Sequence, residues 1–371
     1  MTGAPTYSVV VPTIGRPCLA ECLNTLAAAL GHPPEEVVVV DDRPDATGPL
    51  PLDAAGVLSG RLRTLRTGGR GPAAARNAGW RTVGTPWTVF LDDDVQVQPD
   101  WSRRLAADLG AAGPDTGGVQ GRLSVPLPED RRPTDWERGT AGLERAAWAT
   151  ADMAYRTAAL SAVGGFDERF TRAFREDADL ALRVLEAGWT LRRGRRVTRH
   201  PVRSVDRWVS IRAQRGNADD VLMTRLHGRD WWARAEAPRG RLPRHAVVTA
   251  AALVVCVCAP TAGRPGNRHA PFCRRAAFCR RAAAVAGALW ALGTAEFALA
   301  RIRPGPRTPD EIVTMAATSV VIPPLAVRHW LAGLVRHHGR RPAGRPPAAH
   351  RITDGPRRTA APRSEPSGSA P

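Results

Sequence analysis

Residues 87–94 read WTVFLDDD, an apolar run that ends in three consecutive aspartates. The β-branched and aromatic side chains predict a buried strand over residues 87–91. Three carboxylates directly after such a strand repel one another strongly unless a cation lies among them. Oxygen ligands of this kind suit Mg²⁺ or Mn²⁺. Asp92, Asp93 and Asp94 therefore predict a divalent-metal site, with an exposed acidic turn as the alternative.

The sequence before this motif alternates short apolar runs with helical segments. Strands are predicted over residues 7–12 and 36–41, with a weaker one over 62–66, and helices over 18–30 and 71–83. This order predicts the α/β class, with a parallel sheet flanked by helices. In such sheets ligands bind beyond the carboxyl ends of the strands, where the aspartates of this chain lie.

The chain after the aspartates contains further predicted elements. One strand is expected over residues 118–126, and helices over 99–112, 156–163, 176–187 and 208–226. The stretch between the strand and the second of these helices, residues 126–150, has no regular pattern. We therefore expect an irregular, mobile loop there.

Charge divides the chain into two parts. The net charge is +18, and all 53 basic residues are arginine. Residues 1–239 hold 33 arginines and 30 acidic residues, whereas residues 240–371 hold 20 and 5. The first part is nearly balanced, like an ordinary soluble enzyme. The second is a basic tail of the kind that binds nucleic acid or an anionic membrane surface.

Apolar segments in this tail favour the membrane. They cover residues 245–259, 282–300 and 312–335, and arginines flank them. The first is shorter than the roughly 20 residues that span a bilayer upright, and Pro323 and Pro324 interrupt the third. The tail is expected to span the membrane, to lie in its interface, or to pack on the first part as a helical subdomain.

Other charged residues at element ends form a second set of candidates. Asp41 and Asp42 end a predicted strand, where a carboxylate can accept hydrogen bonds from a nucleobase or ribose. Arg76 lies near a predicted helix start and can pair with a phosphate. Glu176 and Asp177 begin another helix, either as acids that favour its dipole or as a general base toward a hydroxyl.

Seven motifs in order resemble the family 2 glycosyltransferases of the GT-A fold, of the bacterial, actinobacterial type. They are SVVVPTIGRP, VVVVDDRPD, GPAAARNAG, FLDDDVQVQPDW, VGGFDERF, REDADLALRVLEAGW and then His200, and together they cover roughly residues 7–230. The resemblance implies a mixed, mainly parallel Rossmann-like sheet. It also implies an inverting transfer of a sugar from a nucleotide-diphosphate donor to the hydroxyl of a glycan or lipid-linked acceptor.

The resemblance assigns roles to individual residues. The donor-binding residues would be Pro12, Thr13, Asp41, Asp42, Arg76, Asp92 and Asp93. The ligands of Mg²⁺ or Mn²⁺ would be Asp92, Asp94 and His200. The catalytic base would be Asp177, with its neighbour Glu176 as the alternative, and residues 164–167 would form an acceptor-side turn.

The chain also departs from the family pattern. Asp152 stands where the family often has Asn, and Arg43 follows the first acidic pair where glycine is usual. Residues 214–217 match only loosely the QxxRW motif of processive relatives, which argues against a polysaccharide synthase. A sugar-nucleotide pyrophosphorylase-like nucleotidyltransferase is an alternative, but that class typically uses a lysine, and this chain has none.

We therefore predict three regions. Residues 1–235 form the catalytic domain, residues 240–336 a helical, membrane-associating region, and residues 337–371 a disordered tail. The N-terminus runs straight into a strand without a signal peptide, which predicts a catalytic domain at the cytoplasmic face of the cell membrane. A non-enzymatic nucleic-acid-binding protein is the remaining alternative, and no RNA- or DNA-binding motif favours a nucleic-acid partner.

Overall fold

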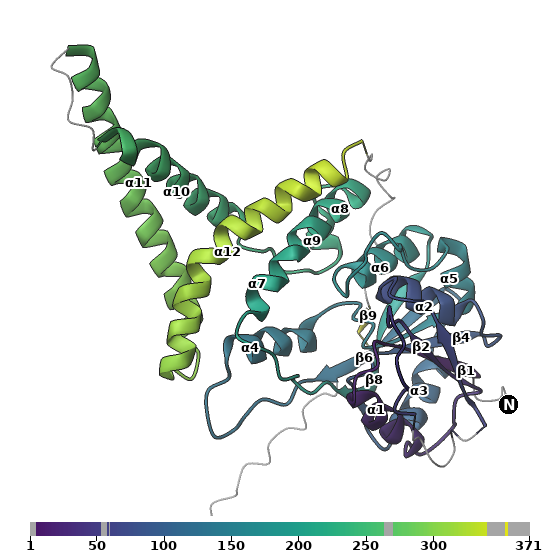
Figure 1. Cartoon of the computed structure of the whole chain (residues 1–371). Helices are drawn as coiled ribbons and strands as arrows, with labels where there is room; N and C mark the ends of the chain where they lie inside the picture. Colours follow the sequence, from purple (N-terminus) through teal and green to yellow (C-terminus); the bar gives the residue numbers. More distant parts are fainter. Residues whose placement is uncertain (1–4, 53–57, 59, 263–269, 340–352, 355–371) are drawn as a thin grey trace, which may run out of the picture.

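A mixed sheet organises the part of the chain that carries the predicted motifs. The computed structural model describes residues 5–52, 58, 60–262, 270–339 and 353–354 (Figure 1), and most of the predicted disordered tail lies outside these ranges. The strands run in the order β3 (Leu62–Arg66), β2 (Val37–Asp41), β1 (Tyr7–Thr13), β4 (Trp87–Leu91), β7 (Asp152–Arg156), β6 (Thr116–Ser124), β8 (Thr190–Arg199) and β5 (Gln96–Val97). A further short strand, β9 (Thr353–Asp354), pairs with β8.

Parallel pairing dominates this sheet. β1 pairs in parallel with β2 and β4, β2 with β3, and β6 with β8. β7 runs antiparallel to both of its neighbours, β4 and β6. Because β7 is reversed relative to both β4 and β6, β6 and its parallel neighbour β8 run in the same direction as β4. The carboxyl ends of β1, β2, β4 and β8 therefore lie at one edge of the sheet. The predicted mixed, mainly parallel α/β sheet is confirmed.

Helices cover both faces of the sheet. Val9 and Val11 of β1 face a core completed by α1 (Cys18–Ala27) and α3 (Trp101–Gly110). Val10 points to the opposite face, where α2 (Pro72–Trp80), α5 (Thr157–Val163) and α6 (Glu176–Glu186) pack. Gly79 lets α2 approach closely, because a Cβ there would lie 2.4 Å from a Val10 methyl group.

The predicted strands and helices before residue 125 are confirmed, with ends shifted by up to three residues. β7 and β8 have no counterpart among the predicted elements. β8 reads TLRRGRRVTR, and its five arginines conceal the alternation of a strand. Leu191 is nevertheless buried on the face covered by α6, and Arg196 and Thr198 are buried on the face covered by α3.

Residues 126–150 contain regular structure, so the prediction of an irregular loop there is wrong. α4 (Asp135–Ala141) begins with a capping box, in which the Thr134 hydroxyl accepts from Glu137 N and the Glu137 carboxylate accepts from Thr134 N. The 3₁₀ helix η2 (Gly142–Arg145) follows. No residue of α4 is buried, so hydrophobic periodicity could not reveal it.

The remaining helices follow β8. The predicted helix over residues 208–226 corresponds to α7 (Val209–Ala213), η3 (Gln214–Gly216) and α8 (Asn217–His227), and a short α9 (Trp231–Arg234) comes next. α10 (Leu242–Ala262), α11 (Ala270–Ile302) and α12 (Pro309–Arg336) are each long and apolar enough to cross a membrane. Figure 1 shows α10 and α11 as a hairpin that extends away from the sheet, while α12 packs beside α8.

Two of these helices differ from the expected apolar segments. α10 has 21 residues because the helix continues beyond the apolar run of residues 245–259 at both ends, so this segment is not too short to span a bilayer. α12 continues through Pro323 and Pro324 and is therefore not broken there. Figure 1 shows a bend about midway along it, as prolines inside a helix cause.

Asp152 lies in the core rather than at a ligand site. Its carboxylate accepts hydrogen bonds from Trp101 Nε1 at 2.9 Å, Arg196 Nε at 2.8 Å and Thr198 Oγ1 at 2.6 Å. Asp152 and Arg196 are both fully buried. Gly121 makes room for this carboxylate, because a Cβ at that position would lie 2.2 Å from it. These contacts join β7 and β8 to α3.

We expect Asp152→Ala to lower the free energy of unfolding by about 3–5 kcal/mol, because it removes the nearer of the two carboxylates that pair with the buried Arg196 charge. Urea denaturation of the full chain in detergent measures this change. Glu236→Ala is the matched control, since it removes a surface ion pair to Arg193 worth about 0–1 kcal/mol. Equal effects of the two substitutions would contradict the assignment.

Candidate active site

A cleft of about 720 Å³ opens at the shared edge of the strand ends. Eight of the predicted site residues line it: Pro12, Thr13, Asp42, Arg76, Asp92, Asp93, Asp94 and His200. The other three, Asp41, Glu176 and Asp177, lie outside the lining. The sheet therefore brings residues from four separate strand ends and one helix to a common cavity.

Asp93 fixes the loop that follows β1. The carboxylate accepts a hydrogen bond from Thr13 Oγ1 at 2.6 Å and from Arg16 Nη1 at 2.8 Å. Burial raises the pKa of Asp93 above its usual value, although the Arg16 charge and the Thr13 hydrogen bond oppose that rise. With both oxygens engaged, Asp93 acts in this structure as a structural anchor for the cleft wall.

Asp92, Asp94 and His200 form a cluster with the chemistry of a metal site. Each offers one ligand atom, and these atoms lie within 4.8 Å of one another. Asp94 and His200 are buried, with Asp94 Oδ1 3.5 Å from His200 Nε2. Two carboxylates and an imidazole are a donor set that suits Mn²⁺ or Mg²⁺. The residues therefore fit the divalent ion that the sequence predicts.

Arg76 bridges two carboxylates from opposite sides. Its Nη1 donates to Glu176 Oε1 at 2.9 Å, and its Nη2 donates to Asp92 Oδ1 at 2.7 Å. The Arg76 side chain is almost fully buried. Within the described chain, Arg76 Nε and Glu176 Oε2 have no hydrogen-bond partner. Arg76 thus links the metal cluster to the start of α6, and its expected nucleotide contact stays a prediction.

The two acids that begin α6 lie behind this bridge. Burial raises the pKa of Glu176 to about 8, with a further contribution from the Asp177 carboxylate. Burial also raises the pKa of Asp177, although the hydrogen bond from Ala178 N and the charge of Arg76 oppose it. A carboxyl group with a raised pKa is suited to proton transfer.

Strained backbone sets the direction in which α6 begins. Arg175, the residue before the helix, has a φ of 76°, in the left-handed region that disfavours non-glycine residues. Its guanidinium lies over the rings of Phe174, Trp231 and Trp232 and pairs with Asp220 at 2.9 Å. These contacts hold the strained turn and thereby fix where the acids of α6 point.

Asp41 and Asp42 are both engaged by nearby loops. Asp41 accepts hydrogen bonds from the backbone and the guanidinium of Arg43. Asp42 accepts from Thr67 Oγ1 and from the backbone N–H groups of Arg70 and Gly71. Asp42 therefore anchors the loop before α2 while lining the cleft, and the predicted contact of these acids with a nucleotide remains untested.

Sequence reasoning missed four further arginines that line the cleft, namely Arg16, Arg172, Arg203 and Arg212. Arg203 Nε lies 2.9 Å from Asp94 Oδ2. All four side chains are at least 32% exposed and so remain accessible to a ligand, unlike Arg76. Arginine is so frequent in this chain that no sequence signal separates these four. Trp136 of α4 also lines the cleft. Sequence reasoning missed this residue because it did not predict α4.

The chain is similar to one protein family and to several known proteins. Residues 8–160 match the model of the family described as glycosyl transferase family 2. The chain is 42% identical over 80 residues to the succinoglycan biosynthesis protein ExoO of Rhizobium meliloti. The aligned segment covers 21% of this chain and 22% of that protein. It is 33% identical over 137 residues to the pre-mycofactocin glycosyltransferase of Mycobacterium tuberculosis, covering 33% and 28% respectively.

The chain thus spans about a quarter of the length of these relatives. Among solved structures it is similar to TarS of S. aureus, with a TM-score of 0.38, 19% identity, and coverage of 61% of this chain and 41% of that one. It is also similar to GalNAc-T7 with UDP, GalNAc and Mn²⁺, with a TM-score of 0.42, 17% identity, and coverage of 54% and 43%. Residues 8–160 of this chain are therefore similar to glycosyl transferase family 2.

Proposed function

We propose that this protein transfers a sugar from a nucleotide-diphosphate donor to an acceptor hydroxyl, with inversion at the anomeric carbon. The observation that carries the proposal is that Asp92, Asp94 and His200 meet exposed arginines in one cleft. Of the three clustered residues, Asp92 and Asp94 fall within the family match of residues 8–160. The family favours this activity over a nucleotidyltransferase.

Five arginines and four aspartates give the cleft the charge pattern for a diphosphate. Arg16 and Arg203 already neutralise Asp93 and Asp94 and present further N–H groups to the cavity. Asp92, Asp94 and His200 would hold Mg²⁺ or Mn²⁺, which supplies positive charge to a nucleoside diphosphate. Guanidinium groups fixed beforehand stabilise the charge that grows on a departing diphosphate.

Asp177 is the proposed base, and Glu176 and Arg76 are its positioning residues. The bridge from Arg76 to Glu176 and Asp92 fixes α6 relative to the metal cluster. Asp177 is half-buried as a residue, whereas Glu176 is fully buried and tied to Arg76. The more accessible carboxylate of the pair is therefore the better acceptor for the proton of a hydroxyl.

We expect Asp177→Asn to lower kcat by about 100-fold or more while the nucleotide still binds, because the amide cannot accept the proton. Turnover is measured by release of nucleoside diphosphate, and binding by thermal shift of the full chain. Asp115→Asn, on the surface beside Thr190, is the matched control and should leave both unchanged.

The pH profile separates a base from a merely structural acid. Because burial raises the pKa of Asp177, and only the ionised carboxylate accepts a proton, kcat should fall with acidification at a higher pH than for an ordinary aspartate. The Asn variant should lack this acid limb. An acid limb of unchanged position in the variant would rule out the assignment.

We expect Asp94→Ala to weaken Mn²⁺ binding by about tenfold or more, because one of three clustered ligands is lost. Calorimetric titration of the full chain with Mn²⁺ measures the affinity, with Asp115→Ala as the control. Equal Mn²⁺ affinity in Asp94→Ala and the parent chain would show that this cluster does not bind Mn²⁺.

The C-terminal helices support membrane association, and we propose that they place the cleft at the cytoplasmic face of the cell membrane, next to a glycan or lipid-linked acceptor. The hairpin of α10 and α11 exposes apolar side chains that a neighbouring element does not cover, such as Val257, Leu289 and Leu292. α12 is the most enclosed of the three candidate spans, because it packs on α8. The hairpin is therefore the part of the tail best placed to enter lipid.

We expect the double variant Val257→Asp and Leu292→Asp to lower partition of the full chain into phosphatidylcholine–phosphatidylglycerol vesicles by about tenfold or more, since charge is costly in hydrocarbon. Both parent side chains are more than 70% exposed. Leu30→Asp, equally exposed but beside α1, is the matched control in the flotation assay. Unchanged flotation of the double variant would show that the hairpin does not enter the bilayer.

A further inference from the structure

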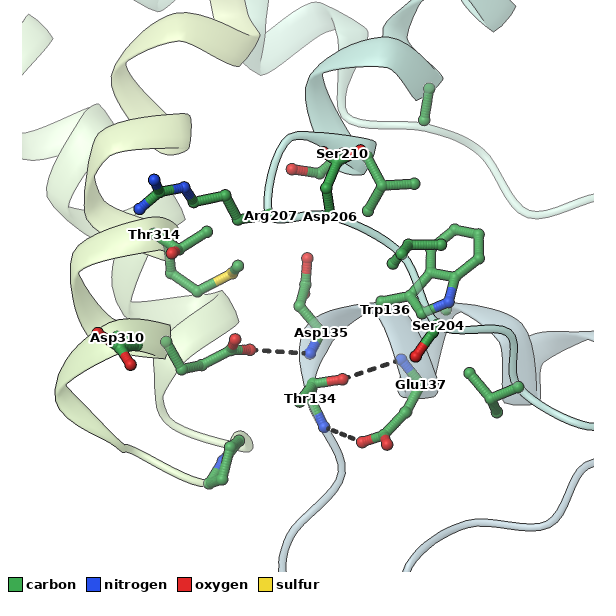
Figure 2. A pocket seen from close by; sticks show the side chains of 18 of the residues that line it. Thr134, Asp135, Trp136, Glu137, Ser204, Asp206, Arg207, Ser210, Asp310 and Thr314 are labelled. Carbon is green, nitrogen blue, oxygen red and sulfur yellow. Dashed lines mark hydrogen bonds between the residues drawn. The ribbon is translucent and has the colours of Figure 1, made fainter.

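A second cavity adjoins the active-site cleft on the side of the C-terminal helices. It has a volume of about 800 Å³, and its walls come from α4, from residues 202–214 and from residues 306–315. Figure 2 shows α4 and Ser204 to Ser210 on one side of it, and Asp310 and Thr314 of α12 on the other. Trp136, Gly139, Arg203 and Ala213 line both cavities. A ligand in the second cavity therefore borders the cleft.

The two cavities differ in charge. Arginines outnumber aspartates in the cleft, whereas the second cavity is lined by five acids and two arginines: Asp135, Glu137, Asp206, Asp310, Glu311, Arg203 and Arg207. Arginines outside the lining pair with Asp135, Glu137 and Asp206, so within the described chain Asp310 and Glu311 are the acids of this wall without an ion pair, and their charge disfavours a phosphate or another anion. Carboxylates instead accept strong hydrogen bonds from hydroxyl groups. The second cavity suits a neutral ligand rich in hydroxyls.

Two further features of its wall point to the same ligand class. Trp136 is held in place by the hydrogen bond from its Nε1 to the carbonyl of Arg203 at 2.9 Å, so its ring offers a fixed apolar surface. Ser210 lines the cavity, and its Oγ is buried with no hydrogen-bond partner among the described residues. Such a group calls for an explanation, and a ligand hydroxyl would satisfy it. Apolar faces beside hydroxyl groups are characteristic of a sugar ring.

The C-terminal helices are part of this site rather than a separate appendage. Glu311 of α12 accepts a hydrogen bond from Asp135 N at 3.1 Å. Arg301 at the end of α11 pairs with the Asp135 carboxylate at 2.9 Å and donates to Thr318 of α12 at 2.8 Å. Arg138 donates to the Arg301 carbonyl at 2.8 Å. The wall of the second cavity is therefore complete only when α4 contacts the end of α11 and the start of α12.

We propose that this second cavity binds the acceptor, and that the part of the acceptor held there is a neutral sugar. The proposal rests on the proposed glycosyl transfer and names the acceptor class for it. The acceptor hydroxyl reaches the cleft through the wall that the two cavities share. Because residues 306–315 comprise the end of the turn after α11 and the first residues of the candidate span α12, a sugar carried on a lipid meets this cavity at the end of the apolar helices.

Cavity filling tests the proposal. The probes are methyl glucoside, methyl galactoside, methyl mannoside and methyl N-acetylglucosaminide, with binding to the full chain in nanodiscs followed by saturation-transfer NMR. We expect at least one glycoside to bind, and Thr314→Trp to weaken its binding by about tenfold or more because the indole occupies the cavity. Val313→Trp is the matched control, since Val313 is 65% exposed and lies outside the lining.

A smaller substitution covers the case in which Thr314→Trp does not fold. Ser210→Ala removes only the unpartnered hydroxyl and should weaken glycoside binding by about threefold or more, the scale of one hydrogen bond. Glycoside binding that both variants leave unchanged would overturn the proposal, as would a panel in which no glycoside binds. Displacement of the glycoside by inorganic phosphate would also overturn it, since the site would then prefer an anion.

Nucleotide binding separates this inference from the proposed function. Thermal shift with Mn²⁺ and a panel of nucleoside diphosphates is run on the same samples. If no nucleotide binds to the parent chain, the glycosyl transfer itself is wrong. If a nucleotide binds equally to the parent chain, Thr314→Trp and Ser210→Ala, while glycoside binding behaves otherwise than expected, only the acceptor site is wrong.

Discussion

The Arg76 guanidinium lies between two carboxylates that approach it from different elements, and the geometry of the cleft depends on this bridge. Asp92 follows β4, Glu176 begins α6, and each contacts one terminal nitrogen of Arg76. Without a cation between them, these acids and the neighbouring Asp177 would repel one another in a region of low polarity. A guanidinium serves this position well, because it stays charged when buried and offers donors in two directions.

The same principle extends outward from the bridge. Asp93 is balanced by Arg16, Asp94 by Arg203, and Asp220 by Arg175 above its aromatic rings. Each pair ties a loop to a neighbouring element, so the acids that would otherwise push the strand ends apart instead hold them together. The cleft is in this sense a network of guanidinium–carboxylate contacts built on the edge of a sheet.

The sequence predicts the sheet well where apolar runs are continuous, as in β1, β2 and β4, because burial on both faces leaves a strong signal. It fails for β8, where one of the five arginines, Arg196, is buried because Asp152 and Asp108 pair with it. It also fails for α4, which is short and has no fully buried residue, although Thr134 and Glu137 carry the spacing of a capping box. The acidic cluster can be predicted because its aspartates directly follow a predicted strand. The cleft arginines and the second cavity come from segments far apart in the sequence, so no local pattern predicts them.

The close approach of Gly121 to Asp152 makes these two positions dependent on each other during evolution. A methyl group at position 121 would collide with the carboxylate at 2.2 Å, so alanine becomes acceptable there only after position 152 has lost its branched acid or amide. Loss of the acid in turn leaves the buried Arg196 with Asp108 as its remaining carboxylate partner. Replacing this arrangement requires changes at positions 121, 152 and 196 in a restricted order. Substitutions in the β6–β7–β8 core are therefore constrained by the residues already present.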